Sequence, residues 1–318
     1  MIDGRECLIT IVRDDGLGED NPTFVIDQDR WRVPSDGLEG FGGVEYEVGT
    51  QAYAQYDGSY LLDERVPERD RSITADAWFD PAEARAEAMA FFIPRRSYTV
   101  HCTYMGVTRY FTGRQYAFEV STGNVWSHPT LKWTCLALEP MWLSEDEKRF
   151  DLAEASGRRG FPFVSFAEGH AVLPTSNDAE ADVTATEPEH IKGFVVGFIS
   201  SRIEMTNGGH GTAYPRFDIS ASDAVVNPAI KVFDASGSVV GQVGLSLTLK
   251  HGDELVVDFS RRPTSITLNG ANVSHRVTRG STLATGIPVG TFYVEWSASS
   301  GDAALSVRPS IHERYTGI

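Results

Sequence analysis

The side chains that most often carry chemistry are spread singly along this chain of 318 residues. Its eight histidines show no spacing typical of metal ligands, which favours ordinary strand or surface positions. The chain contains no Gly-x-Ser-x-Gly nucleophile elbow, no His-Glu-x-x-His helix and no Gly-x-x-x-x-Gly-Lys phosphate loop. We therefore predict that the chain is not an enzyme and has no catalytic residues, no metal site and no cofactor.

Two other segments have compositions that can bind ligands. The loop Gly208-Gly209-His210-Gly211 is rich in glycine, but a strand rather than a helix is predicted after it, so a flexible inter-strand loop is favoured over a phosphate site. Asp178, Glu180 and Asp182 could offer oxygens to calcium, but the EF-hand pattern is missing and a solvated acidic edge is favoured. A glycosidase pair cannot be chosen, because carboxylate separations are not visible in sequence.

The six tryptophans suggest either sugar stacking or packing against a partner. Three fall within strand patterns, where core or inter-subunit packing is favoured: Trp78, Trp133 and Trp296. The other three look peripheral: Trp31, Trp126 and Trp142. Together with Phe24, which lies in the poorly patterned stretch 16–43, these three are our candidates for a subunit interface. Saccharide binding is the second hypothesis.

Composition limits the classes of partner. The formal net charge of −16 would repel phosphate backbones and anionic lipid, so we predict no direct nucleic-acid binding. No apolar run approaches the ~18 residues of a transmembrane helix, which predicts no membrane insertion. The first residues lack the order of a signal peptide, so folding in a cytosol is expected. The three cysteines are too few and too far apart for a disulfide framework and are predicted to be buried thiols.

Alternating apolar and polar residues between 191 and 307 predict short antiparallel strands. Leu245, Leu247 and Leu249 form one such pattern, and Asn269-Gly270 predicts a hairpin turn with positive φ. In the first half, strands are predicted around a single amphipathic helix at about 81–93, begun by Asp80 and Pro81. The fold class is therefore mainly β, with two sandwich-like domains at 1–150 and 151–318.

The order of these signals resembles the distal tail protein family of long, non-contractile-tailed phages (siphoviruses). Nearly the whole chain carries the resemblance, through these segments: Tyr56-Asp57-Gly58, Arg71 to Thr74, the helix, Leu138-Glu139-Pro140, Phe161-Pro162-Phe163, Gly193 to Ile199, Asn207-Gly208, Asn227-Pro228, Leu249 to Leu255 and Leu268 to Val273. Two departures are Gly209-His210, where an acidic residue is usual, and the stretch 16–43.

The resemblance implies a structural virion protein at the tail tip, made and assembled in the bacterial host cytoplasm. Six N-terminal domains would form a baseplate hub ring on the tail tube protein, and the C-terminal domains, galectin-like jelly-roll sandwiches similar to carbohydrate-binding modules, would point outward. The ring would join the tube to a tail-tip lysin or fibre protein that serves host adsorption, and the tape measure protein is a further implied neighbour. The alternative from another class is a saccharide-binding module or a divergent β-sandwich glycosidase.

Overall fold

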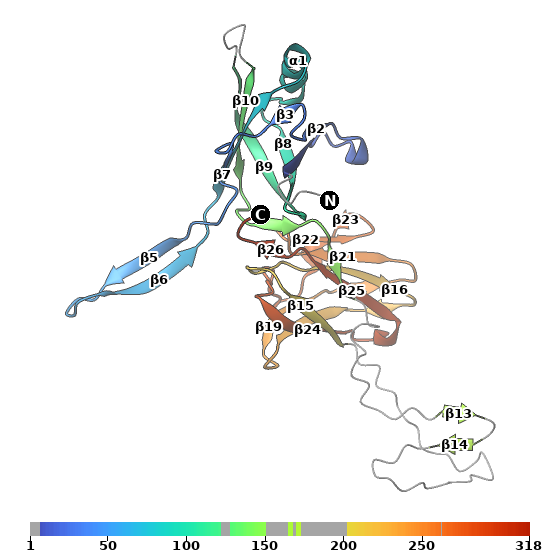
Figure 1. Ribbon diagram of the computed structural model, residues 1–318. Coiled ribbons are helices and arrows are strands. Elements are labelled where there is room, and N and C mark those ends of the chain that lie inside the picture. The colour runs from blue at the N-terminus through green and yellow to red at the C-terminus, as the bar shows by residue number, and fades with distance from the viewer. Residues whose placement is uncertain (1–6, 122–127, 151–164, 168–169, 173–201, 262) are drawn as a thin grey trace.

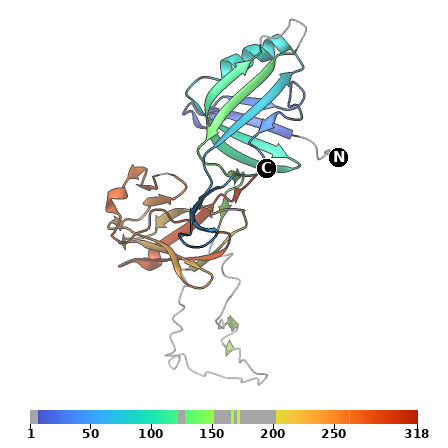
Figure 2. The same cartoon turned by 90° about the vertical axis from the view of Figure 1, so that its left-hand side faces the viewer.

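The computed structural model describes residues 7–121, 128–150, 165–167, 170–172, 202–261 and 263–318. In this part of the chain the fold is mainly β with one α-helix, as predicted. Buried apolar side chains form two separate clusters, which we call the first core and the second core. Figures 1 and 2 show the first core, with the helix at its far end, above the second. Predictions for Trp126, for Asp178, Glu180 and Asp182, and for 161–163 and 193–199 lie outside the described residues.

A ten-stranded antiparallel sheet, the first sheet, encloses the first core. Its strands are β1 (Cys7–Arg13), β2 (Thr23–Ile26), β3 (Trp31–Arg32), β4 (Leu38–Glu39), β7 (Arg69–Ala77), β8 (Ser97–Tyr104), β9 (Val107–Val120), β10 (Thr130–Ala137), β11 (Trp142–Ser144) and β26 (Arg314–Tyr315). The main order is β2-β1-β8-β9-β10-β7-β3. Alternate residues point inward, so Tyr98, Val100 and Cys102 of β8 are buried while their neighbours are partly exposed. Cys135 is also buried and Cys7 is half-buried, and all three thiols are free.

The helix α1 spans Pro81–Phe91 and packs on the first core through Ala84, Ala88 and Phe91. Pro81 occupies the first helical turn as predicted, because its fixed φ suits that position. The expected hydrogen bond from a helix amide to the Asp80 carboxylate is absent: this residue is left-handed, with φ 44°, and its side chain caps no amide. The helix ends at Phe91 rather than Ile93, because Phe92 has already turned extended.

Between β4 and β7 the chain leaves the first core as a two-stranded hairpin, β5 (Glu47–Ala52) and β6 (Ser59–Arg65). Figure 1 shows this hairpin projecting away from both cores, and we call it the arm. Apart from Gly49, every residue of its two strands is exposed.

Two sheets enclose the second core, as predicted for a sandwich. One sheet contains β12 (Lys148–Arg149), β25 (Leu305–Ile311), β16 (Arg216–Ala221), β21 (Glu254–Asp258), β22 (Ser265–Leu268) and β23 (Ala271–Asn272). The other contains β15 (Arg202–Asn207), β24 (Gly290–Ser297), β18 (Ala229–Asp234) and β19 (Val239–Gly244). Short pairs are formed by β13 (Ser165–Ala167) with β14 (His170–Val172) and by β17 (Val225–Val226) with β20 (Thr248–Leu249). The described residues also include the 3₁₀ turns η1 (Gly18–Asp20), η3 (Ser274–Arg276) and η4 (Asp302–Ala304).

In the second half of the chain, the sequence predicted a turn correctly but predicted one strand as longer than it is. Asn269 and Gly270 have φ values of 50° and 80°, which confirms the predicted hairpin turn. The leucine alternation at 245–249 does not form one strand: Leu245 makes an isolated bridge to Val277, and only Thr248–Leu249 is a strand. Leu245 and Leu249 are nevertheless buried, because a bent segment still places alternate residues inward.

The chain passes between the two cores twice. Phe150, at the end of β12, packs in the second core. After β25 the chain returns, and Arg314–Tyr315 pair with β11 of the first sheet. We call residues 312–318 the C-terminal strap. The division into domains near residue 150 stays a prediction, and the strap ties the two cores together across it.

Candidate assembly site

Three of the four predicted interface residues lie inside the first core. Phe24, Trp31 and Trp142 are each at most 1% exposed, and Trp126 lies outside the described residues. The Phe24 ring lies 5.7 Å from Trp31, and the Trp142 Nε1 donates to the Phe41 carbonyl over 3.1 Å. The expectation that Trp31 and Trp142 are peripheral is therefore wrong, because distant segments cover both rings. An interface role for these residues stays a prediction, and it would require the first core to open.

A buried cation beside Trp142 gave no signal in the sequence. The Arg71 guanidinium lies 4.0 Å from the Phe111 ring centre and 4.4 Å from that of Trp142, and it donates to the Pro140 carbonyl over 2.7 Å. Burial lowers the pKa of Arg71 to about 9, because the charged form loses its hydration. These contacts fix the end of the first sheet from which the arm departs.

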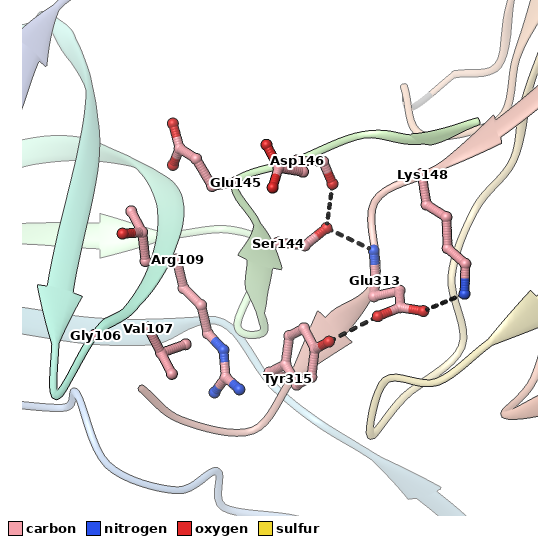
Figure 3. Close-up of a pocket in the computed structure, with 10 residues that line it drawn as sticks. Gly106, Val107, Arg109, Ser144, Glu145, Asp146, Lys148, Glu313 and Tyr315 are labelled. Atoms are coloured by element: carbon pink, nitrogen blue, oxygen red, sulfur yellow. Dashed lines mark hydrogen bonds and ion pairs between the residues drawn. The ribbon is translucent and has the colours of Figure 1, made fainter.

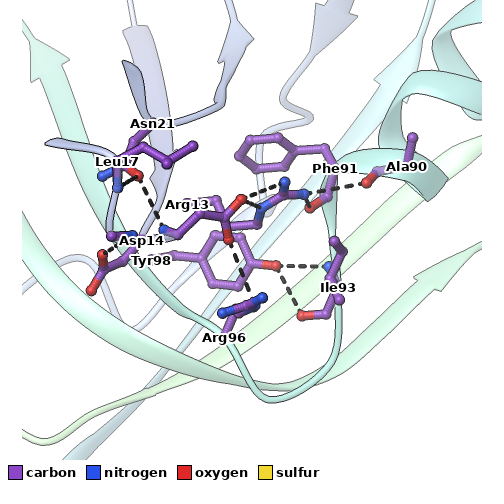
Figure 4. Close-up of polar contacts among 11 residues, drawn as sticks. Arg13, Asp14, Leu17, Asn21, Ala90, Phe91, Ile93, Arg96 and Tyr98 are labelled. Atoms are coloured by element: carbon purple, nitrogen blue, oxygen red, sulfur yellow. Dashed lines mark hydrogen bonds and ion pairs between the residues drawn. The ribbon is translucent and has the colours of Figure 1, made fainter. Parts of the chain in front are cut away.

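A second cluster holds the C-terminal end of α1 (Figure 4). Arg13 of β1 donates to the Phe91 carbonyl over 2.7 Å and to Asp15 over 2.7 and 2.9 Å. A cation placed there satisfies carbonyl groups that the helix itself leaves free. The hydrogen bond from Arg13 is the main cause that lowers the pKa of Asp15. Tyr98 adds a second anchor, exchanging hydrogen bonds of 2.8 and 3.0 Å with the Ile93 backbone.

A cleft of about 600 Å³ lies where the two cores meet. It is lined by the β8–β9 turn, by residues 144–146, by Lys148 and by Glu313 and Tyr315 of the strap (Figure 3). The Glu313 carboxylate accepts hydrogen bonds from Tyr315 (2.7 Å), the Gly208 amide (2.9 Å) and Lys148 (3.2 Å). Burial alone would raise the pKa of Glu313, but these donors outweigh it and hold the pKa below its ordinary value.

The polar side chains of the cleft form hydrogen bonds between the segments that link the two cores. The Ser144 hydroxyl donates to the Asp146 carbonyl and accepts from the Glu313 amide, at 2.9 and 3.0 Å. Arg109 of β9 stacks 3.8 Å from the Tyr315 ring centre and donates to the Gly317 carbonyl. Within the described residues, no group of three or more histidine, cysteine or acidic side chains could hold a metal ion.

The glycine-rich loop is held in place by the strap. The amides of His210 and Gly211 donate to the Arg314 carbonyl, at 2.7 and 3.2 Å. Asn207, which is 1% exposed, donates to the Gly211 and Ile287 carbonyls at 3.0 and 2.9 Å. The loop does connect two strands, β15 and β16, but its backbone is tied at several points, so the prediction of flexibility is not supported.

The arm has one polar and one apolar face. Its strand register pairs Glu47 with Arg65 and Gln51 with Tyr60, and both pairs are joined by side-chain hydrogen bonds of 2.6 and 2.8 Å. Residues at even positions of β5 point to the opposite face, which carries Val48, Thr50 and Ala52 of β5 and Ser59, Leu61 and Glu64 of β6. Val48 and Leu61 are more than half exposed. We call this side the apolar face of the arm.

Four more exposed apolar side chains lie in the helix or within three residues of its ends. They are Trp78, Phe79, Met89 and Ile93, which are 50%, 68%, 51% and 38% exposed, and we call them the helix-side surface. Arg32 lies 4.5 Å above the Trp78 ring, and His128 stacks against the same ring at 4.9 Å. Of the five tryptophans in the described chain, Trp78 is half-exposed and the other four are buried, which weakens the case for an aromatic sugar platform.

Comparison with known proteins gives structural but not sequence relatives. No protein-family model matches the chain, and no curated protein matches it. The Dit protein (gp 19.1) of phage SPP1, described as a hub adsorption apparatus of phages that infect Gram-positive hosts, aligns with a TM-score of 0.60 at 12% identity. That alignment covers 96% of this chain and 98% of the other. A chain of the phage P2 baseplate in its activated, calcium-containing conformation aligns with a TM-score of 0.58 at 10% identity, covering 98% and 99%. At these identities the likeness shows the fold, and it confirms the predicted resemblance at that level.

Proposed function

We propose that this chain is a distal tail protein, a non-enzymatic virion component that forms the hub at the tip of a siphovirus-type tail. The observation that carries the proposal is the alignment over nearly the full length of both chains with a phage hub protein. An alignment of that extent matches both cores, and not only a sandwich of the kind that many unrelated proteins share. In the proposal, residues 1–150 build a six-membered ring and 151–318 face outward.

The arm supports assembly into a ring. A two-stranded hairpin on its own is only marginally stable in water, and this one exposes an apolar face. Such a surface is expected to be covered in the working protein. A head-to-tail contact between copies covers it on every copy when the rotation closes into a ring. The tail tube protein would dock on one side of this ring, and a lysin or fibre protein on the other.

The test is the mass of the purified chain by light scattering on a sizing column, with negative-stain images of the peak. A ring of about six copies with a central opening is the expected result, either alone or after addition of the cognate tail tube protein. A chain that stays monomeric in both conditions and binds cell-wall glycan would refute the proposal in favour of a saccharide-binding module.

A further inference from the structure

The glycine-rich loop fits against the C-terminal strap because it has no side chain at the point of contact. A Cβ atom added at Gly209 would lie 2.7 Å from the Arg314 carbonyl oxygen and 2.9 Å from the Arg314 amide nitrogen. Both partners are backbone atoms, which cannot rotate out of the way as the end of a side chain can. Close approach of two backbones is one of the uses of glycine. The strap, and not a ligand, therefore accounts for the glycine at this position.

A second glycine seats the other end of the strap. A Cβ atom added at Gly317 would lie 2.9 Å from the Gly43 amide nitrogen and 3.5 Å from the Phe41 carbonyl oxygen. The Gly317 carbonyl accepts a hydrogen bond from Arg109 of β9, and Ile318 packs against the first core. Figures 1 and 2 place this end of the chain between the two cores. The strap thus has one close backbone contact with each core.

The segment that Gly317 touches is the base of the arm. Residues 41–43 lead from β4 towards β5, and Arg69 begins β7 on the returning side of the arm. The Arg69 guanidinium donates to the Gly42 carbonyl over 3.3 Å and to the Gly43 carbonyl, so it joins the two sides where the strap ends. We call residues 41–43 and Arg69 the arm base.

The strap itself lies at the surface. Every residue from 312 to 318 is half-buried and none is fully buried, whereas Ile311 directly before them is buried in the second core. Its hydrogen bonds reach both cores, since Thr316 bonds the His210 ring over 3.1 Å and Tyr315 pairs with Trp142 of β11. A half-buried segment of this kind can lift without the unfolding of either core.

We infer that the strap is a conformational coupling element that links the glycine-rich loop of the second core to the arm base. While the strap is seated, it fixes the loop and the arm base together, and when it lifts, both become looser. Coupling between two sites is reciprocal, so a disturbance at either end reaches the other. All the contacts lie within one copy, so the inference does not depend on the proposed function.

Hydrogen–deuterium exchange of the full chain, read by mass spectrometry, tests the coupling. In a Gly209→Ala variant, amide exchange in β4 and at the start of β7 should become about fivefold faster or more, although the substitution lies in the second core. These amides report on the arm base because β4 pairs with β7, and β7 pairs with β10. Gly241→Ala is the matched control: its Cβ would collide with the Thr285 side chain of the second core, away from the strap, and β4 and β7 should exchange as in the wild type.

The reverse experiment starts at the arm base. Gly317→Ala should speed the exchange of the His210 and Gly211 amides, which bond the Arg314 carbonyl. Gly42→Ala is the control there, because a Cβ at Gly42 meets no atom within 4 Å. Combining Gly209→Ala with Gly317→Ala should loosen the arm base no further than the stronger single variant, since both lift the same strap.

The outcomes are distinct. Faster exchange that stays in the loop for Gly209→Ala, and in the arm base for Gly317→Ala, would overturn the inference. An equal effect of Gly241→Ala on β4 and β7 would also overturn it, by assigning the change to a general loss of stability. Thr316→Val removes the bond to His210 with little change of shape, and it should give the same two-ended pattern more weakly if Gly209→Ala does not fold.

Discussion

Replacing Phe24 by alanine distinguishes a core role for this residue from an interface role. The ring is 1% exposed and lies 5.7, 5.4 and 5.2 Å from the rings of Trp31, Phe91 and Phe92. Truncation of a buried phenylalanine costs about 3–5 kcal/mol, and three aromatic neighbours place this one in the upper part of that range. We expect a loss of about 4 kcal/mol and a fall of roughly 10 °C in the unfolding midpoint of the first core.

The assay is urea unfolding followed by tryptophan fluorescence, at two protein concentrations an order of magnitude apart. Trp31, Trp133 and Trp142 report on the first core. A core role gives the same loss at both concentrations, whereas an interface role gives a loss that depends on concentration. Val25→Ala is the control, because Val25 lies next to Phe24 on β2 but is 43% exposed and should change stability by less than about 0.5 kcal/mol. A loss below about 1 kcal/mol for Phe24→Ala would refute the reasoning.

Three further predictions concern polar contacts. Arg13→Ala should lower the free energy of unfolding by about 2 kcal/mol, because its charge-assisted hydrogen bonds to the end of α1 are lost. Arg96→Ala is the control: Arg96 is half-exposed and lies 3.6 Å from Asp15, so its loss should cost less than about 0.5 kcal/mol in the same urea titration. Asn207→Ala should lower the free energy of unfolding of the second core by about 3 kcal/mol, because its buried side-chain amide bonds several backbone groups at once. In calorimetry, the unfolding transition of the second core should move to lower temperature while that of the first core stays in place. The pKa of Glu313 is lowered by folding, so its stabilising contribution is present above its ordinary value of 4.5 and disappears as the pH falls through the lower folded value. Glu313→Gln should therefore flatten the loss of stability in acid, and an unchanged acid limb would contradict the assigned network.

Features set by neighbouring residues were accessible from the sequence. The hairpin turn at Asn269-Gly270 follows from two residues that tolerate positive φ, and the helix start follows from the fixed φ of Pro81. The alternation predicted between 191 and 307 matches the burial of Leu255 and Val257 in β21, although Asp258 is buried there as well. Each of these depends on backbone preferences or on a period of two, which a sequence displays directly.

Features set by distant residues were not accessible. Trp142 looked peripheral in the sequence, but Phe41 and Phe111 cover it from other parts of the chain. Arg71 is in phase with the buried residues Ile73 and Ala75 of β7, but only the fold reveals the two rings around its guanidinium. The pairing of β11 with β26 joins residues that are far apart in sequence, and nothing in either short strand indicates its partner.

Because β11 pairs with β26, the second core is inserted between two neighbouring strands of the first sheet. Leu143 and Arg314 are directly opposite each other in β11 and β26, so the chain leaves and re-enters the first sheet at points about 5 Å apart. Everything between them can in principle be exchanged for another module, or for a short turn, without altering the order of strands in the first sheet. A protein built this way can retain its first sheet while the module between these two points is replaced by recombination. The same two positions are the natural junctions for engineering chimeric proteins on this scaffold.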